Sequence, residues 1–223
     1  MMMLRMLVLS VAMGLFVSSA TATPLKQDRK ADGLNTKSIF FDDSIRHLSK
    51  LSGFSCRFDQ LMVFSDGGDE QYSGTLAILK PKRFRWQYQK PYEQLYIGDG
   101  QIIWHYEPDL MQAERLNNLE SVDPAVMRLL NGQIKPSEIR MLKQGYDKTL
   151  DIRRFQVSIE GSPKVWLGFS KHGDLIYIER QDMLGNRNQM YLSECSYVAP
   201  AANLFSFTPP ADVDVLDMRS ASQ

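Results

Sequence analysis

The chain has 223 residues with 26 basic and 26 acidic side chains, so its formal net charge is zero. A neutral chain has no basic field to gather phosphate groups, which argues against nucleic acid as its main ligand. The length allows one domain with a sizeable core, and a composition of 43% hydrophobic and 10% aromatic residues is typical of a folded globular protein.

The N-terminus predicts an export signal. Arg5 supplies one positive charge ahead of a short apolar run, and Ala20 and Ala22 form an A-x-A cleavage site. The run is too short to cross a bilayer, which needs about 20 residues. No cysteine near the cleavage site can carry a lipid. We therefore expect a signal peptide over residues 1–22 and a soluble periplasmic protein that begins at Thr23.

The mature chain is expected to open with a leader and a helix. Residues 23–36 are polar and have no period, which predicts a flexible leader ahead of a single domain over residues 37–223. From Lys37 to Leu51 the apolar residues advance by four, three and three positions, the spacing of one helix face. Gly53 follows as the stop. A helix with one apolar face must lie on another apolar surface.

After this helix the apolar period changes to two, which is the spacing of half-buried strands. In RFRWQY (83–88) the aromatic side chains share one side and the polar side chains share the other. Turns such as Gly98-Asp99-Gly100 separate the short strands, and this order of strands and turns is typical of an antiparallel meander. The expected strands lie within residues 54–64, 72–80, 83–88, 95–97, 102–106, 155–159, 165–169, 176–178, 190–197 and 204–207.

A second short helix interrupts the strands. Asp123 can cap it, Pro124 suits its first turn and Gly132 ends it. Two amphipathic helices need an apolar surface to cover, and the concave side of a curved sheet is the only large one available. We expect a mainly β (α+β) fold: an incomplete, strongly curved antiparallel β-barrel with a short-helix lid over an apolar cavity.

Motifs for catalysis or for binding metals and cofactors do not appear in the sequence. The three histidines have no partner at metal-ligand spacing, and there is no nucleophile elbow, Walker loop or dinucleotide fingerprint. The glycines of GFSKHG (168–173) are better explained by a hairpin turn. We expect no catalytic residue, no metal and no cofactor.

Two cysteines stand far apart in the sequence, Cys56 in the first expected strand and Cys195 in a late one. An oxidising periplasm permits a bond between them. Such a bond would close a loop of about 140 residues, worth on the order of 4 to 5 kcal/mol by the chain-entropy relation. Two buried thiols are the alternative, and both readings stay open at this point.

A recognisable pattern begins with the strand at residue 74 and ends at residue 112. Its matching residues are Lys80, Pro81, Phe84, Trp86, Pro91, Glu93, Gln94, Asp99, Gly100, Trp104, Tyr106, Pro108 and Gln112. Together with LSKLSGFSCRFDQ (48–60) and FSFTPPADVDV (205–215), this block resembles the periplasmic outer-membrane lipoprotein carriers, the LolA family. The resemblance covers most of the mature chain.

The resemblance implies a function and a set of partners. Members of that family carry triacylated lipoproteins from an inner-membrane ABC-type release complex to an outer-membrane receptor lipoprotein, with no cofactor of their own. The lipid is expected to enter between sheet and lid, and we expect a monomer. The candidates for the acyl-chain cavity are Leu48, Phe54, Phe58, Leu76, Ile78, Phe84, Trp86, Ile97, Trp104, Tyr106, Val126 and Leu130.

One departure from the family pattern concerns the lid. Family members carry an arginine before the first proline of the block, where it helps to latch the lid, and this chain has Lys80. Lysine cannot make the planar, multi-donor bridge of arginine. We therefore expect a looser latch, or a role shared with Arg83 or Arg85. The alternative is that Lys80 is only a soluble strand end.

Other functions remain as alternatives. A related β-sheet sensor would bind lipid or misfolded outer-membrane protein as an envelope-stress signal, but this chain ends soon after the expected sheet. A periplasmic hydrolase with an acidic pair is disfavoured by the missing nucleophile and metal motifs. A carrier dedicated to another lipid-linked product fits the sequence as well as a general one does.

Overall fold

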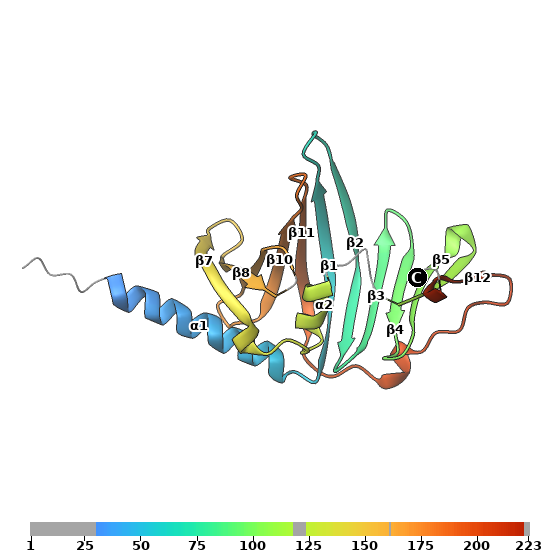
Figure 1. Cartoon of the computed structure of the whole chain (residues 1–223), viewed down its shortest axis with the longest axis horizontal. Helices are drawn as coiled ribbons and strands as arrows, with labels where there is room; N and C mark the ends of the chain where they lie inside the picture. The colour runs from blue at the N-terminus through green and yellow to red at the C-terminus, as the bar shows by residue number, and fades with distance from the viewer. Residues whose placement is uncertain (1–29, 118–123, 161, 221–223) are drawn as a thin grey trace, which may run out of the picture.

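The computed structural model describes residues 30–117, 124–160 and 162–220 (Figure 1). These residues form one open, curved sheet in the order β12-β6-β5-β4-β3-β2-β1-β11-β10-β9-β8-β7. Neighbouring strands run antiparallel except β12 and β6, which are parallel. The predicted mainly β class is confirmed.

The strands of the sheet are β1 (Gly53–Val63), β2 (Asp69–Leu79), β3 (Arg83–Lys90), β4 (Gln94–Gly98), β5 (Ile103–Glu107), β6 (Gln112–Leu116), β7 (Ile139–Asp147), β8 (Ile152–Ile159), β9 (Val165–Phe169), β10 (Leu175–Gln181), β11 (Arg187–Ser196) and β12 (Asp214–Asp217). The α-helices are α1 (Lys30–Lys50) and α2 (Pro124–Leu130), with short 3-10 turns η1 (Pro108–Leu110), η2 (Pro136–Glu138), η3 (Ala202–Phe205) and η4 (Met218–Ser220). In the described part of the chain, neither helix is long and apolar enough to span a membrane.

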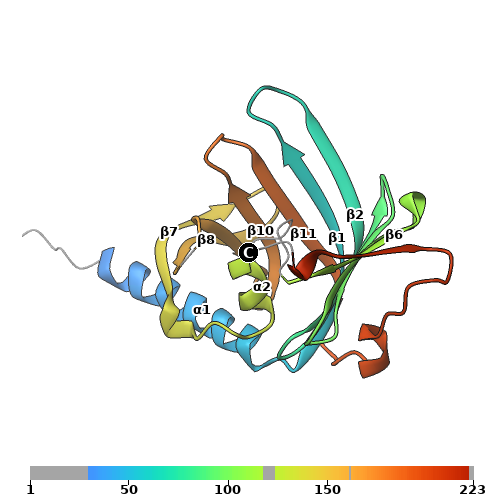
Figure 2. The same cartoon turned by 45° about the vertical axis from the view of Figure 1, so that its right-hand side comes forward.

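Both helices lie against the same face of the curved sheet (Figures 1 and 2). Phe41, Ile45 and Leu48 of α1 and Val126 and Leu130 of α2 are buried in one cluster with the inward side chains of the sheet. This is the main hydrophobic core. The apolar stripe predicted for each helix is therefore the face that it buries.

A second, smaller cluster occupies the opposite, outer face. Trp86 of β3 pairs with Tyr96 of β4, and both belong to the main core. Because side chains alternate along a strand, their neighbours on β4 point to the other side. There the C-terminal segment covers them. The outer cluster consists of Leu95, Ile97, Trp104 and Ala113, with Ile102, Tyr106, Phe207 and Val213 packed against it.

The start of the folded part differs from the prediction. α1 begins at Lys30, so the end of the predicted leader (23–36) is helical and continuous with the helix predicted from Lys37. These polar residues extend a helix whose later turns are buried, and each added residue gains one backbone hydrogen bond. The predicted signal peptide (1–22), the rest of the leader and the predicted cap Asp123 lie outside the described residues.

Three strands were not predicted from the sequence, namely β6, β7 and β12. β7 is an edge strand that buries only Ile139 fully, and all four residues of β12 are exposed. Neither has the alternation from which strands are predicted. The strand predicted over residues 204–207 is wrong, because the chain forms the turn η3 there before it packs on the outer cluster.

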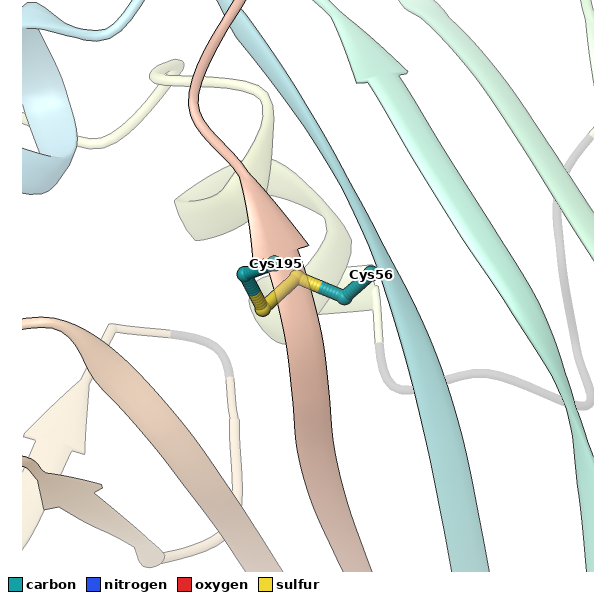
Figure 3. Close-up of a disulfide and its surroundings, with 2 residues drawn as sticks. All are labelled: Cys56 and Cys195. Carbon is teal, nitrogen blue, oxygen red and sulfur yellow. A yellow bond between two sulfur atoms is a disulfide. The ribbon is translucent and has the colours of Figure 1, made fainter.

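A disulfide links β1 to its neighbour β11 (Figure 3). The Cα atoms of Cys56 and Cys195 are 4.1 Å apart, although 139 positions separate them in the chain. The pairing register shifts at this point, and Glu194 adopts a left-handed backbone with φ 49°. The resulting bulge directs Cys195 toward β1. Of the two readings that the sequence left open, the structure contains the disulfide.

Candidate functional site

The inner face of the sheet is an apolar wall that the two helices cover. Most of the cavity candidates lie where this wall and the helices meet, in the main core, and each of these is at most 5% exposed. They are Leu48, Phe54, Phe58, Leu76, Ile78, Phe84, Trp86, Val126 and Leu130. In this conformation the side chains of α1 and α2 therefore occupy the surface that the sequence analysis assigned to a ligand.

Three of the cavity candidates lie elsewhere. Ile97, Trp104 and Tyr106 belong to the outer cluster, where Phe207 packs on both aromatic rings at centroid distances of 5.7 Å and 5.3 Å. They cannot line a cavity on the inner face. The prediction failed because alternation shows which residues share a face but not which face is inward.

An open cavity of about 370 Å³ remains between α2 and the β3–β6 part of the sheet. This volume is near the lower end of the roughly 300–1,000 Å³ of small-molecule pockets. Of the twelve residues predicted for the acyl-chain cavity, Phe84 alone lines it. The other lining residues are Lys82, Gly98, Gly100, Gln101, Ile102, Ile103, Leu116, Asn117, Met127, Arg128, Asn131 and Gln133. Leu116 was missed because its strand, β6, was missed.

Aromatic rings follow one another across the inner wall. The ring of Phe58 lies 5.7 Å from Trp86, and the ring of Tyr88 lies 6.4 Å from both Trp86 and Tyr96. Burial raises the pKa of Tyr88, whose hydroxyl donates to Gln60 Oε1 at 3.0 Å. The phenol therefore stays neutral at physiological pH. The wall offers broad, uncharged contact area that suits aliphatic chains without fixing their position.

Lys80, at the end of β2, connects the sheet to the ends of both helices. Its Nζ donates to the carbonyl oxygens of Leu48 at 2.5 Å and Ser49 at 3.3 Å, in the last turn of α1. Carbonyls at this end of a helix carry partial negative charge and attract a cation. A Cβ added to Gly132, just after α2, would lie 3.0 Å from Lys80 Cδ. The side chain of Lys80 thus binds the end of α1 and lies close to the residue that follows α2.

Arg83 and Arg85, the residues expected to share this role, point elsewhere. Arg83 Nε donates to the carbonyl of Asp99 at 3.2 Å, and Arg85 reaches Gln87 Oε1 at 3.4 Å. Both partners belong to the sheet or its turns. Of these three cations, Lys80 is therefore the one that holds the end of α1.

Burial lowers the pKa of Lys80 to about 8 from the ordinary 10.5. Between these two pH values the folded protein has lost the proton that the unfolded chain keeps, so folding becomes more favourable as pH rises. We expect the free energy of unfolding of the wild type, relative to Lys80→Met, to increase from pH 8 to pH 10. Denaturant unfolding of both proteins measures this, and a constant difference would contradict the burial of the amine.

Metal chemistry finds no support in the described part of the chain. Within residues 30–117, 124–160 and 162–220, no three His, Cys, Asp or Glu side chains are grouped to hold an ion. The site that these residues do form is an apolar wall, two helices that cover it and a lysine at their ends.

Comparison with known protein families shows which family this chain belongs to. Residues 49–208 match the family model of the outer membrane lipoprotein carrier protein LolA. The chain belongs to the LolA family. The family resemblance seen in the sequence is thereby confirmed, as is the prediction of a lipoprotein carrier and not an enzyme. The LolA family is periplasmic, and a disulfide is consistent with that oxidising compartment.

Individual LolA-family relatives cover most of the chain. The outer-membrane lipoprotein carrier protein of Dechloromonas aromatica (strain RCB) is 34% identical over 166 residues, which are 71% of this chain and 78% of the relative. That of Neisseria meningitidis serogroup B (strain ATCC BAA-335 / MC58) is 30% identical over 170 residues, 74% and 80% of the two chains. A solved structure, an uncharacterized conserved protein from Thermus thermophilus, shares the fold with a TM-score of 0.51 at 10% identity, covering 82% of this chain and 99% of its own.

Proposed function

We propose that this LolA-family protein shelters the acyl chains of lipoproteins between its curved sheet and helices α1 and α2. It carries them through the periplasm from an inner-membrane ABC-type release complex to an outer-membrane receptor lipoprotein. The observation that carries the proposal is the apolar inner wall, which two separate helices cover mainly through apolar contacts. Such contacts can be exchanged for contacts with lipid.

The need for a shelter follows from the size of the cargo. Three acyl chains of about 16 carbons would expose some tens of methylene groups, each costing roughly 0.8 kcal/mol in water. A lipoprotein with its chains in water would not cross an aqueous space at a useful rate. The carrier must cover this surface and yet release it at the outer membrane.

The cargo enters by displacing the helices. The cavity of about 370 Å³ is too small for three acyl chains, so binding needs α1 and α2 to move away from the wall. The helices and the lipid then compete for the same aromatic and aliphatic side chains. The net affinity is the difference between two similar apolar contacts, which keeps the exchange reversible.

Lys80 acts as the latch of the closed state in this mechanism. Its ammonium holds the end of α1 through two carbonyl oxygens, a weaker grip than the five donors of an arginine. We expect Lys80→Met to speed the uptake and release of a fluorescent acyl probe several-fold and Lys80→Arg to slow both. Stopped-flow fluorescence measures the rates. Equal rates in all three proteins would remove Lys80 from the mechanism.

The carrier function is tested with spheroplasts that hold radiolabelled lipoproteins in the inner membrane. The purified protein should release them into the soluble fraction in proportion to its concentration, and mass spectrometry should find acylated protein bound to it. An unrelated periplasmic protein of similar size serves as the control. Release no greater than with that control overturns the proposal.

A further inference from the structure

The turn between β10 and β11 carries apolar side chains at its tip. It reads Asp182-Met183-Leu184-Gly185-Asn186, and Met183 and Leu184 are 103% and 77% exposed. Turn positions ordinarily hold Gly, Asn, Asp, Ser or Pro, which favour turn backbones or hydrogen-bond to them. Two large, exposed apolar side chains are therefore unusual at such a turn. Departures from local sequence preferences are expected at functional sites.

Hydrogen bonds close the same turn without using its two apolar side chains. Asp182 Oδ1 accepts the backbone N–H groups of Leu184 at 2.9 Å and Asn186 at 3.0 Å, and Asp182 Oδ2 accepts Asn186 Nδ2 at 2.8 Å. Gly185 supplies the left-handed residue, with φ 92°. The side chains of Met183 and Leu184 therefore take no part in closing the turn. They stand on a turn that other groups close.

The neighbouring β1–β2 hairpin extends the apolar surface. The Ser65 N–H donates to Asn186 Oδ1 at 2.9 Å, which joins the two tips. The run LMVF (61–64) leading to this tip is only half buried at every position, so apolar side chains are partly exposed on both faces of the strand. Figures 1 and 2 show both tips projecting beyond the rest of the sheet. We name Phe64, Met183 and Leu184 the hairpin-tip patch.

The charges beside the hairpin-tip patch indicate what it contacts. Asp66, Asp69 and Glu70 are exposed at the β1–β2 tip, and within residues 61–70 and 181–188 the one exposed base is Arg187, at the start of β11. An anionic membrane would repel this excess of acids by about 1 kcal/mol per charge. A protein surface with basic side chains would instead attract them. Burying Met183 and Leu184 contributes roughly 1.5–3 kcal/mol each, which suits a brief contact.

We propose that the hairpin-tip patch docks into an apolar socket rimmed by basic side chains on the protein of the inner membrane that hands over the cargo. The inference rests on the proposed carrier function and assigns the surface by which the carrier finds its donor. The partner is a protein and not the lipid surface, because the acids at the tip complement bases and oppose anionic lipid.

The test compares Met183→Ser/Leu184→Ser with the wild type in two assays. In the first, lipoprotein release is followed from proteoliposomes that contain the release complex, as a function of carrier concentration. In the second, the carrier takes up lipoprotein directly from detergent micelles, without a partner. We expect the half-maximal concentration in the first assay to rise at least tenfold and micelle uptake to stay within twofold of the wild type.

Two further variants sharpen the test. Leu110→Ser/Met111→Ser removes a second exposed apolar pair, 65% and 49% exposed in and after η1, and should leave release unchanged. Asp66→Lys/Asp69→Lys should weaken release, since it reverses the charge that meets the basic rim.

Three results would overturn the inference, and they are distinguishable. Unchanged release by Met183→Ser/Leu184→Ser removes the hairpin-tip patch as a docking surface. Binding of the wild type to phosphatidylglycerol and phosphatidylethanolamine vesicles, lost in that variant, replaces the protein partner with lipid. A wild type that takes up no lipoprotein even from micelles fails the proposed carrier function itself, and the inference with it.

Discussion

Replacing Leu130 with alanine is expected to make the protein less stable and to tighten its binding of acyl chains. Leu130 is fully buried in α2 against the inner wall, so the truncation costs about 2–5 kcal/mol of packing. That loss destabilises the closed state, in which α2 covers the wall and which must open before the ligand binds. If about 2 kcal/mol of it falls on the closed state, the apparent affinity rises up to about 30-fold. Titration with a fluorescent fatty acyl probe measures the change.

Val157 provides the matched control for this prediction. It is as deeply buried in the same core, but it belongs to β8 and thus to the wall itself. Val157→Ala should lower the melting temperature and leave the affinity for the probe unchanged or weaker. If both variants gain affinity alike, general loosening explains the result. If neither gains, α2 is a fixed part of the core and not a cover.

Removal of the disulfide is expected to have the largest effect on stability. The link between Cys56 and Cys195 spans 139 positions, and a loop of that size restricts the unfolded chain by about 4 to 5 kcal/mol. Reduction should lower the free energy of unfolding by this amount. Affinity for acyl chains should change little, because β1 and β11 remain paired along their length. Denaturant unfolding with and without reductant measures the loss.

Two cysteine variants control the disulfide measurement. Cys195→Ser should be as unstable as the reduced wild type, since either change breaks the same link. Cys56→Ala/Cys195→Ala should not respond to reductant at all. A reduced wild type that unfolds at the same denaturant concentration as the oxidised protein would contradict the chain-entropy account.

The sequence predicts this fold well where one face of an element is buried. The alternation in β3 places Phe84 and Trp86 in the core, and the stripes of α1 and α2 are the faces that the helices bury. Where burial is weak the pattern vanishes. β7 and β12 are edge strands with little or no alternation, so no periodicity marks them.

The candidate site was predictable by residue type but not by side of the sheet. Trp86 and Trp104 look alike in sequence, each within an alternating aromatic segment, yet one faces the helices and the other faces Phe207. The C-terminal segment buries the outer face of the sheet at this point, and the residues of β5 and its neighbours in the chain do not indicate this burial. The contacts of Lys80 with α1 depend on residues about 30 positions away, which only the tertiary structure brings together.

Hydrogen exchange of the whole protein, with and without a triacylated lipopeptide, tests most directly whether α1 and α2 leave the inner wall. We predict that the lipopeptide speeds exchange at the backbone amides of α1 and α2 while those of β8–β11 stay protected. Lipopeptide binding with undiminished protection in both helices would contradict the account, because the wall would then be closed to the cargo.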